Sequence, residues 1–169
     1  TASLLGPNAL KFKSGVSGLC GRDSNNCLAR YQAKATDIKK WLIENQIFLE
    51  RYRGLYAYPQ FRETIRPRLR APTIYEPSLV AGLARAQHAL TALHGNPQTA
   101  LRQLRDDTNY WRRILQQSRS LISRMIAVAA IHGNTQLISE IIASTSIDPQ
   151  TLAIASQASQ PLTASERDL

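Results

Sequence analysis

From Thr36 onward, apolar and polar positions alternate with the period of an amphipathic α-helix. Apolar or aromatic residues recur three or four positions apart for about five turns, and one position of this stripe is an asparagine. The stripe consists of Ile38, Trp41, Leu42, Asn45, Phe48, Leu49, Tyr52, Leu55 and Tyr56. It predicts one long helix over about 36–56, with Thr36 or Asp37 at the N-cap.

A second helix is predicted from an apolar stripe that consists of Leu79, Leu83, Ala86, Leu90 and Leu93. It should end at 94–96, where Gly95 can take the left-handed conformation that closes many helices. Pro97 follows, at a position typical of the first turn of a helix. We therefore expect a tight turn and a further helix with Ala100, Leu101 and Leu104 facing inward.

A long helix is expected from about Asp107 to residues 132–134. Its predicted buried face consists of Trp111, Ile114, Leu115, Leu121, Ile122, Met125 and Val128. Thr135 then begins a short helix whose inward positions are Leu137, Ile138, Ile141 and Ile142. A last helix is expected from Pro149 to about Gln157, with Asp148 as its N-cap.

One pentapeptide occurs twice with a single difference, at its fourth position. His94-Gly95-Asn96-Pro97-Gln98 reappears 38 residues later as His132-Gly133-Asn134-Thr135-Gln136. Each copy separates segments rich in Ala, Leu and Ile, so two helical hairpins with the same turn are expected. The spacing is close to the roughly 34-residue period of tetratricopeptide repeats, although the small and aromatic positions of that repeat are not matched. The alternative is that Gly-Asn ends a helix twice without forming a repeat.

These patterns predict an all-α fold, an irregular helical bundle of about 5–7 helices with tetratricopeptide-like hairpins in its second half. One continuous core should bury the large side chains of the two longest helices. These are Trp41, Phe48, Leu55, Trp111, Ile114, Leu121, Ile122 and Met125.

The helical period does not extend to the two ends of the chain. We expect an extended arm with a disulfide loop over 1–35, a single helical domain over 36–160 and a flexible tail over 161–169. Four prolines between Tyr58 and Ser78 exclude a long helix there and predict a structured crossover.

The two cysteines, Cys20 and Cys27, are separated by six polar or turn-forming residues. Thiols this close can reach the Cα separation of about 4.4–6.8 Å that a disulfide requires, and a disulfide indicates an oxidising compartment. The alternative is a pair of free thiols, one buried and one exposed. The sequence has no signal peptide and no run of 18 apolar residues, and a membrane anchor upstream of Thr1 is compatible with it.

The composition indicates one globular domain with a strongly basic middle. The 169 residues are 43% apolar and 20% charged, which excludes intrinsic disorder and collagen-like sequence. The net charge is +9, and residues 51–124 contain 13 basic residues, all arginines, against 4 acidic ones. Because arginine pairs bidentately with carboxylate and phosphate groups, this segment predicts an anionic partner.

The arginines are densest between Arg62 and Arg70, where Pro67 stiffens the backbone. We expect an acidic protein or an anionic envelope polymer to bind at Arg62, Arg66, Arg68, Arg70, Arg112 and Arg113. The alternative is a solvated loop whose arginines pair with carboxylates such as Glu44, Glu50 and Glu63.

Several short motifs carry a resemblance to a known group of proteins. They are Cys20 with Cys27-Leu28-Ala29-Arg30, Leu49-Glu50-Arg51-Tyr52-Arg53-Gly54-Leu55, Tyr58-Pro59-Gln60-Phe61 and Tyr110-Trp111-Arg112-Arg113-Ile114-Leu115. Over residues 20–145 the chain resembles uncharacterised bacterial envelope proteins with an N-terminal membrane segment and an all-helical exported domain. The resemblance implies an exported location and no known activity.

No enzyme signature is present in the sequence. It lacks a phosphate-binding glycine loop, a Gly-x-Ser-x-Gly elbow and a His-Glu-x-x-His pair. The Asp106-Asp107-Thr108-Asn109 segment is similar to an Asp-rich magnesium motif, but we expect its acids to stabilise a helix N-terminus. No glutamate has the Glu-Ser context of lytic transglycosylases, and no histidine is paired with an acid or a cysteine. We expect no catalytic residue, no metal and no cofactor.

The sequence therefore predicts a non-catalytic helical interaction domain on the periplasmic or extracytoplasmic side of the bacterial envelope. It would bind an acidic protein or an anionic polymer through its Arg-rich face. The alternative is a nucleic-acid-binding helical module that uses the same arginines, because phosphate contacts require only positive charge within reach. An oxidising compartment argues against nucleic acid, so the state of Cys20 and Cys27 separates the two hypotheses.

Overall fold

The computed structural model describes residues 12, 15, 20, 25–62, 75–145 and 148–167. These residues contain eight α-helices, one short 3-10 helix and no strand, so the fold is all-α as predicted. The elements are α1 (Cys27–Ala33), α2 (Ala35–Glu44), α3 (Gln46–Gly54), η1 (Leu55–Ala57), α4 (Tyr75–Leu93), α5 (Pro97–Gln117), α6 (Leu121–Ser144), α7 (Pro149–Ala158) and α8 (Ala164–Arg167).

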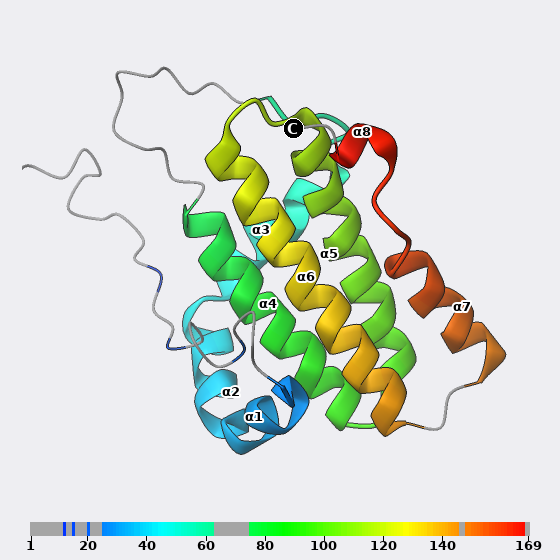
Figure 1. Cartoon of the computed structure of the whole chain (residues 1–169). Coiled ribbons are helices and arrows are strands. Elements are labelled where there is room, and N and C mark those ends of the chain that lie inside the picture. The colour runs from blue at the N-terminus through cyan, green and yellow to red at the C-terminus, as the bar shows by residue number, and fades with distance from the viewer. Residues whose placement is uncertain are drawn as a thin grey trace, which may run out of the picture.

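Helices α4, α5 and α6 form the centre of the bundle (Figure 1). Each of the three packs against the other two. The short helices α1, α2 and α3 lie against α4, while α7 and α8 pack against α5. The turns at 94–96 and 118–120 are short, so successive central helices run antiparallel.

The turn between α4 and α5 forms as the sequence predicts. Gly95 has a φ of +85°, in the left-handed region that is strained for residues with a side chain. The backbone N–H of Asn96 donates to the carbonyl of Thr91 at 3.2 Å, and Pro97 is the first residue of α5. The glycine and the proline together therefore mark this helix boundary.

The next boundary differs from the prediction. Helix α5 runs unbroken through Asp107, and the chain turns at 118–120, where neither glycine nor proline is present. The Ser120 side chain caps α6 by accepting a hydrogen bond from the N–H of Ser123 at 3.4 Å. Arg124 donates through Nε to the carbonyl of Ser118 at 3.0 Å. Side chains of the turn and of the following helix thus take the place of a glycine stop.

The second His-Gly-Asn copy is not a turn. His132, Gly133 and Asn134 lie inside α6, so the predicted pair of hairpins with a repeated turn is wrong, and the tetratricopeptide-like interpretation loses this support. A Cβ atom at Gly133 would lie 2.4 Å from Nη1 of Arg85. Gly133 is therefore needed for the close approach of the Arg85 side chain from α4.

The helix predicted over 36–56 is divided into α2 and α3 at Asn45. This residue leaves the helical conformation, with φ −116° and ψ 19°. Its buried side-chain amide donates to the carbonyl of Trp41 at 2.7 Å, and its backbone N–H donates to the same carbonyl at 3.0 Å. A side-chain amide that bonds to the backbone favours departures from helical dihedral angles, so the helix is interrupted at Asn45.

The helical bundle begins earlier than predicted. Helix α1 occupies residues 27–33, which the sequence pattern placed in an extended arm. The backbone N–H groups of Cys27 and Leu28 donate to the Glu140 carboxylate of α6, at 2.9 and 2.6 Å. This carboxylate satisfies donors that the start of a helix leaves without intrahelical partners. Residues 27–35 therefore belong to the bundle.

Cys20 and Cys27 are joined by a disulfide, as expected. Their Cα atoms lie 5.2 Å apart, within the range that the bond requires. Cys27 is fully buried at the start of α1, whereas Cys20 is partly buried. The disulfide therefore ties the chain before α1 to the core of the bundle.

Burial agrees with the predicted core in α5 and disagrees with it in α6. Trp111 and Ile114 are buried. Leu121, Ile122 and Met125 are 62%, 64% and 60% exposed, so their predicted burial is wrong. The turn at 118–120 changes the direction in which the following residues face, so the apolar stripe of α5 does not continue into α6.

The first half of α6 buries small and polar side chains in place of the large apolar ones. The buried residues there are Ser123, Ala127, Ala130, Gly133 and Asn134. Small side chains allow the backbone of α6 to lie close to its neighbours. In the N-terminal helices, Trp41, Phe48 and Leu55 are partly buried against the core.

Candidate interaction site

A buried polar network joins the helices at the centre of the bundle. The carboxylate of Asp107 on α5 is fully buried. Its Oδ1 accepts hydrogen bonds from the hydroxyls of Tyr52 and Tyr56, the latter at 2.8 Å, and its Oδ2 accepts one from Nδ2 of Asn134 at 2.7 Å. Asp107 lies in the middle of α5, so its predicted role at a helix N-terminus is wrong.

The network continues to α4 and along α5. Trp111 donates through Nε1 to the Tyr52 hydroxyl at 2.7 Å, and Arg85 donates through Nε to Oδ1 of Asn134 at 2.9 Å. Burial raises the pKa of Tyr52 well above its ordinary value, and the neighbouring Asp107 charge raises it further. The phenol therefore stays protonated and keeps its hydrogen bond, and the network fixes how the central helices pack.

His88 of α4 is buried beside this network. Its Nδ1 lies 3.0 Å from Oε1 of Gln103. Burial lowers the pKa of His88 to about 4, although the charge of Asp107 acts in the opposite direction. The imidazole is neutral at pH 7 and adds no positive charge to the bundle. In the part of the chain that the structure describes, no three His, Cys, Asp or Glu residues are grouped so that they could hold a metal ion.

Two side chains of α5 hold an irregular segment along the end of the bundle. Arg113 donates to the carbonyls of Tyr58 and Tyr56, at 2.5 and 3.3 Å. The side-chain oxygen of Gln117 accepts a hydrogen bond from the N–H of Phe61 at 2.5 Å. Residues four positions apart share one face of a helix, so Arg113 and Gln117 act together. They fix the segment 56–61 beside the end of α5.

This arrangement forms two clefts that share Gln60, Phe61 and Arg62. The larger cleft, of about 610 Å³, also includes Gln117 and Arg119. We call these five residues the basic cleft, because the described residues that line it include two arginines and no acidic residue. The smaller cleft, of about 270 Å³, is lined mainly by apolar side chains and by Arg113. The basic cleft lies where α5 ends and the turn to α6 begins.

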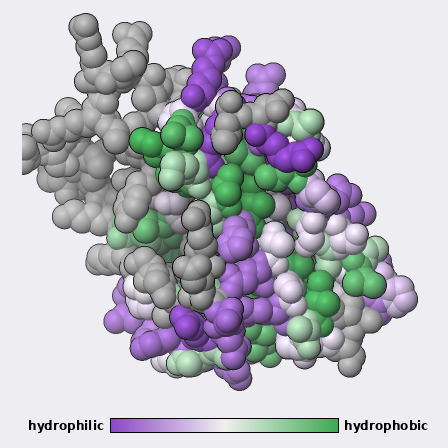
Figure 2. Space-filling view, in the orientation of Figure 1, coloured by the Kyte–Doolittle hydropathy of each residue, from purple (hydrophilic) through white to green (hydrophobic). Residues whose placement is uncertain are grey.

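Helix α6 begins directly after the basic cleft with an exposed apolar face, which we define as Leu121, Ile122, Met125 and Val128. Figure 2 shows hydrophobic side chains gathered over this part of α6. Single exposed apolar residues are common, but a group of large ones is typical of a contact surface. The end of the bundle thus combines positive charge with apolar surface.

Within the described residues, α6 is also the one helix long and apolar enough to cross a membrane. In this fold its other face packs against α4 and α5. That face contains the buried Asn134 amide, which is bonded to Asp107. The packing therefore uses α6 as a central helix of the bundle.

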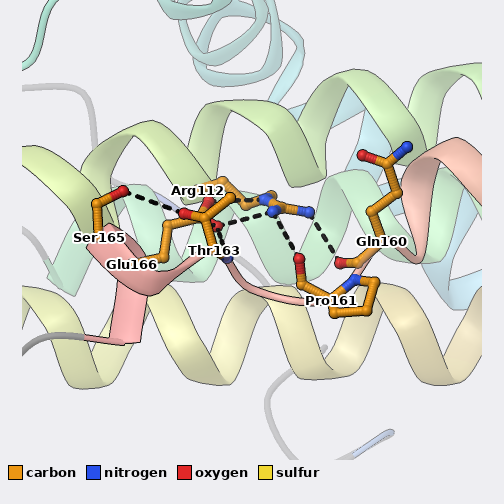
Figure 3. Close-up of polar contacts among 6 residues, drawn as sticks. All are labelled: Arg112, Gln160, Pro161, Thr163, Ser165 and Glu166. Carbon is orange, nitrogen blue, oxygen red and sulfur yellow. Dashed lines mark hydrogen bonds and ion pairs between the residues drawn. The ribbon is translucent and has the colours of Figure 1, made fainter.

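Arg112 is engaged in a different part of the structure. Its Nε and Nη2 donate to the two oxygens of Glu166 at 2.7 Å each, and its Nη1 and Nη2 donate to the carbonyls of Gln160 and Pro161 at 2.9 and 3.0 Å (Figure 3). Thr163 also donates to Glu166, through its N–H at 2.6 Å and its hydroxyl at 2.9 Å. These bonds hold α8 against α5, where the sequence predicted a flexible tail.

The contact between Arg112 and Glu166 predicts acid-sensitive docking of α8. The Arg112 hydrogen bonds lower the pKa of Glu166 to about 2, from an ordinary value of 4.5. A carboxyl whose pKa is lower in the folded state stabilises that state above pH 4.5 and loses this effect as the pH falls toward 2. We expect the docked segment to lose about 1–3 kcal/mol over this range.

Hydrogen exchange of the Thr163 and Glu166 amides at several pH values checks this expectation. The matched variant is Glu166→Gln, which keeps the shape of the side chain and cannot ionise. In this variant the amides of residues 163 and 166 should exchange fast at neutral pH. Their exchange should depend on acid only as the intrinsic exchange rate does. Equal protection of these amides in both proteins at pH 7 would contradict the role given to the Glu166 carboxylate.

The structure separates the arginines that the sequence grouped together. Among the three that it describes, Arg62 lines the basic cleft. Arg113 supports the neighbouring segment through backbone carbonyls, and Arg112 is bonded to Glu166. The remaining predicted binding residues, Arg66, Arg68 and Arg70, lie outside the described residues.

Gln117, Arg119 and the apolar face of α6 were not predicted from the sequence to be part of a site. A signal was available in the polar run Gln116-Gln117-Ser118-Arg119-Ser120, which interrupts the apolar period. A run of this kind is typical of a helix end. A turn predicted at this run would have led to the further prediction that the residues after it are exposed.

Comparison with known proteins gives no relative from which a function could be transferred. No protein-family model, no curated protein and no solved structure matches this chain. The function must therefore be argued from the site itself.

Proposed function

We propose that this chain is a non-catalytic interaction domain of the bacterial envelope that binds an acidic protein. The contact surface consists of the basic cleft and the apolar face of α6. One observation carries the proposal, namely the adjacency of the two surfaces. Arg119 lines the basic cleft, and the exposed Leu121 begins the apolar face two residues later.

The mixed character of this surface favours a protein over an anionic polymer. Removing a large apolar side chain from water stabilises a complex by about 1.5–3 kcal/mol when the burial is complete. Guanidinium groups also orient the bound partner, because they form paired hydrogen bonds to its carboxylates. An acidic protein segment with apolar residues on one side uses both parts of the surface. A polymer of anionic groups would use the arginines and leave the apolar face exposed.

The disulfide supports an extracytoplasmic location. Such bonds persist in the periplasm and outside the cell, and they are rare in the cytosol. The bond between Cys20 and Cys27 ties the chain to the buried start of α1. A periplasmic domain meets envelope proteins and polymers, whereas cellular nucleic acid is in the cytoplasm. We therefore place the partner in the envelope.

Affinity capture from an envelope extract tests the proposal with charge-reversed variants. Arg62→Glu with Arg119→Glu reverses the charge of the basic cleft. The matched control is Lys39→Glu with Arg102→Glu, two exposed basic residues on α2 and α5 outside the cleft. Both double variants change the net charge equally. We expect the cleft variant to lose the captured acidic protein by about tenfold or more, and the control to change capture by less than about twofold.

Salt dependence and thermal unfolding complete the test. Screening shortens the reach of charges from about 8 Å at physiological salt to about 3 Å at 1 M, so capture by the parent should weaken as salt rises. Equal thermal stability of the two double variants excludes misfolding as the cause of a loss. The proposal fails if the cleft variant and the parent recover the same protein equally, or if nuclease treatment of the extract abolishes capture.

A further inference from the structure

A separate pocket of about 340 Å³ lies between α4 and α6, beside the disulfide. Its lining is mostly small and apolar, and includes Gly82 and Arg85 of α4, Ala129, Ala130 and Gly133 of α6, and Cys20. It shares no lining residue with the basic cleft. Its volume lies at the lower end of the range of about 300–1,000 Å³ that is typical of small-molecule sites.

Arg85 supplies the positive charge of this pocket from a buried position. The residue is 9% exposed. Its Nη2 donates to the carbonyl of Ala130 at 3.1 Å, and its Nε donates to the Asn134 amide. The atoms nearest to a Cβ at Gly133 would be Nη1 and Cζ of Arg85, at 2.4 and 2.5 Å. The guanidinium group therefore lies directly against a glycine of the pocket wall.

Among the described residues, the hydrogen-bond partners of Arg85 are the Asn134 amide, the Ala130 carbonyl and the Tyr31 hydroxyl, all of them neutral, and no carboxylate is bonded to it directly. The nearest carboxylate of the network, Asp107, is reached through the Asn134 amide. A buried cation is costly unless an anion and further hydrogen bonds compensate it. An anion that enters the pocket would provide this compensation at the guanidinium group.

We propose that this pocket binds a small monocarboxylate with an apolar body, whose carboxylate pairs with Arg85. One guanidinium group matches one carboxylate, since the two can form paired N–H···O bonds. Besides Arg85, the polar side chains of the lining are those of Ser78 and His132, and the other lining residues are alanines, glycines, Ile126 and the disulfide-bonded Cys20. The same walls favour a hydrocarbon body, because they offer apolar surface to cover. This site is independent of the acidic-protein surface.

Titration of the disulfide-intact chain with hexanoate tests the proposal. Amide NMR shifts of Ala130 and Gly133 report binding at the pocket wall. We expect saturable shifts at millimolar or lower concentration, and binding of hexanol that is weaker by about tenfold or more, because the alcohol lacks the charge that Arg85 recognises. Shifts of equal size with both probes would show that Arg85 does not recognise the carboxylate.

The variant that blocks the pocket must leave the buried network intact. Arg85→Gln removes the charge but also a hydrogen bond to Asn134, so misfolding could explain a loss of binding. Ala129→Trp adds bulk at an exposed residue of the pocket wall and leaves Arg85 in place. Ala143→Trp is the matched control, since Ala143 is an exposed alanine of α6 away from the pocket.

We expect Ala129→Trp to weaken hexanoate binding by about tenfold or more, and Ala143→Trp to leave it within about twofold. The proposal is overturned if the parent shows no saturable shift up to about 10 mM hexanoate. It is equally overturned if the Ala129→Trp variant binds hexanoate as tightly as the parent.

Discussion

Replacement of Asp107 with alanine is expected to lower the free energy of unfolding by about 3–5 kcal/mol. The carboxylate is fully buried and accepts hydrogen bonds from Tyr52, Tyr56 and Asn134. Without it, the buried Tyr52 hydroxyl, the buried Asn134 amide and the partly buried Tyr56 hydroxyl each lose an acceptor at once. Each unsatisfied buried donor costs about 1–3 kcal/mol, and Arg85 also loses the nearest negative charge of the network.

Asp106 provides the matched control for this variant, because it is the adjacent residue of α5. Its carboxylate is exposed and pairs with Arg105 at 2.9 Å on the surface. Exposed pairs of this kind contribute about 0–1 kcal/mol, so Asp106→Ala should change stability by less than about 1 kcal/mol. Urea unfolding of both variants and the parent measures the difference. Similar values for the two variants would contradict a central role for the Asp107 network.

Replacement of Trp111 with alanine is expected to cost about 3–5 kcal/mol, as is typical of a large aromatic residue removed from a core. Its side chain is 1% exposed, its Nε1 donates to the Tyr52 hydroxyl at 2.7 Å, and its ring packs edge-on against Tyr110 with centroids 5.3 Å apart. The variant removes the apolar contacts and leaves a cavity between the helices.

Leu121→Ala is the contrasting variant, because both residues belong to the core that the sequence predicted. Leu121 is 62% exposed, so its truncation should cost less than about 1 kcal/mol. Unfolding by urea, followed by far-ultraviolet circular dichroism, allows comparison without relying on tryptophan fluorescence. A cost at Leu121 as large as that at Trp111 would place the start of α6 inside the core and remove the apolar face.

The parts of the fold that the sequence predicts are those with a strong local signal. Gly95 and Pro97 mark a turn because one favours a left-handed backbone and the other begins a helix without an N–H to satisfy. Trp111 and Ile114 share one helical face, and their burial follows from the period alone. Both signals act within a few residues, so the rest of the fold does not need to be known.

Other features depend on tertiary contacts that the sequence does not show. Gly133 is flanked by a histidine and an asparagine in the sequence, as Gly95 is, but it lies within a helix. A glycine is required there because Arg85 from α4 occupies the space that a side chain would fill. Asp107 looks like a helix cap until its partners on α3, η1 and α6 are known. Charge clustering likewise could not show that Arg112 is bonded to Glu166, which is 54 residues away.

The candidate site was only partly predictable for a similar reason. Arg62 was identified from charge density, which is a property of the sequence alone. The apolar face of α6 was missed because its exposure depends on the turn at 118–120, and this turn is stabilised by Ser120 and Arg124 without a glycine or a proline. When an apolar stripe is followed through a turn that the sequence does not reveal, it predicts burial for residues that face solvent in the structure.

The most direct test of the proposed contact surface is site-specific photo-crosslinking in the bacterial envelope, where we propose that the chain acts. A photoreactive side chain replaces Met125 on the apolar face of α6 or, as a control, Leu152 on α7, which is also an exposed apolar residue. We expect an adduct with an acidic protein from position 125, none from position 152, and loss of the adduct when Arg62 and Arg119 are both changed to Glu. An adduct from position 152 alone, or one from position 125 that persists after the charge reversal, would contradict the account.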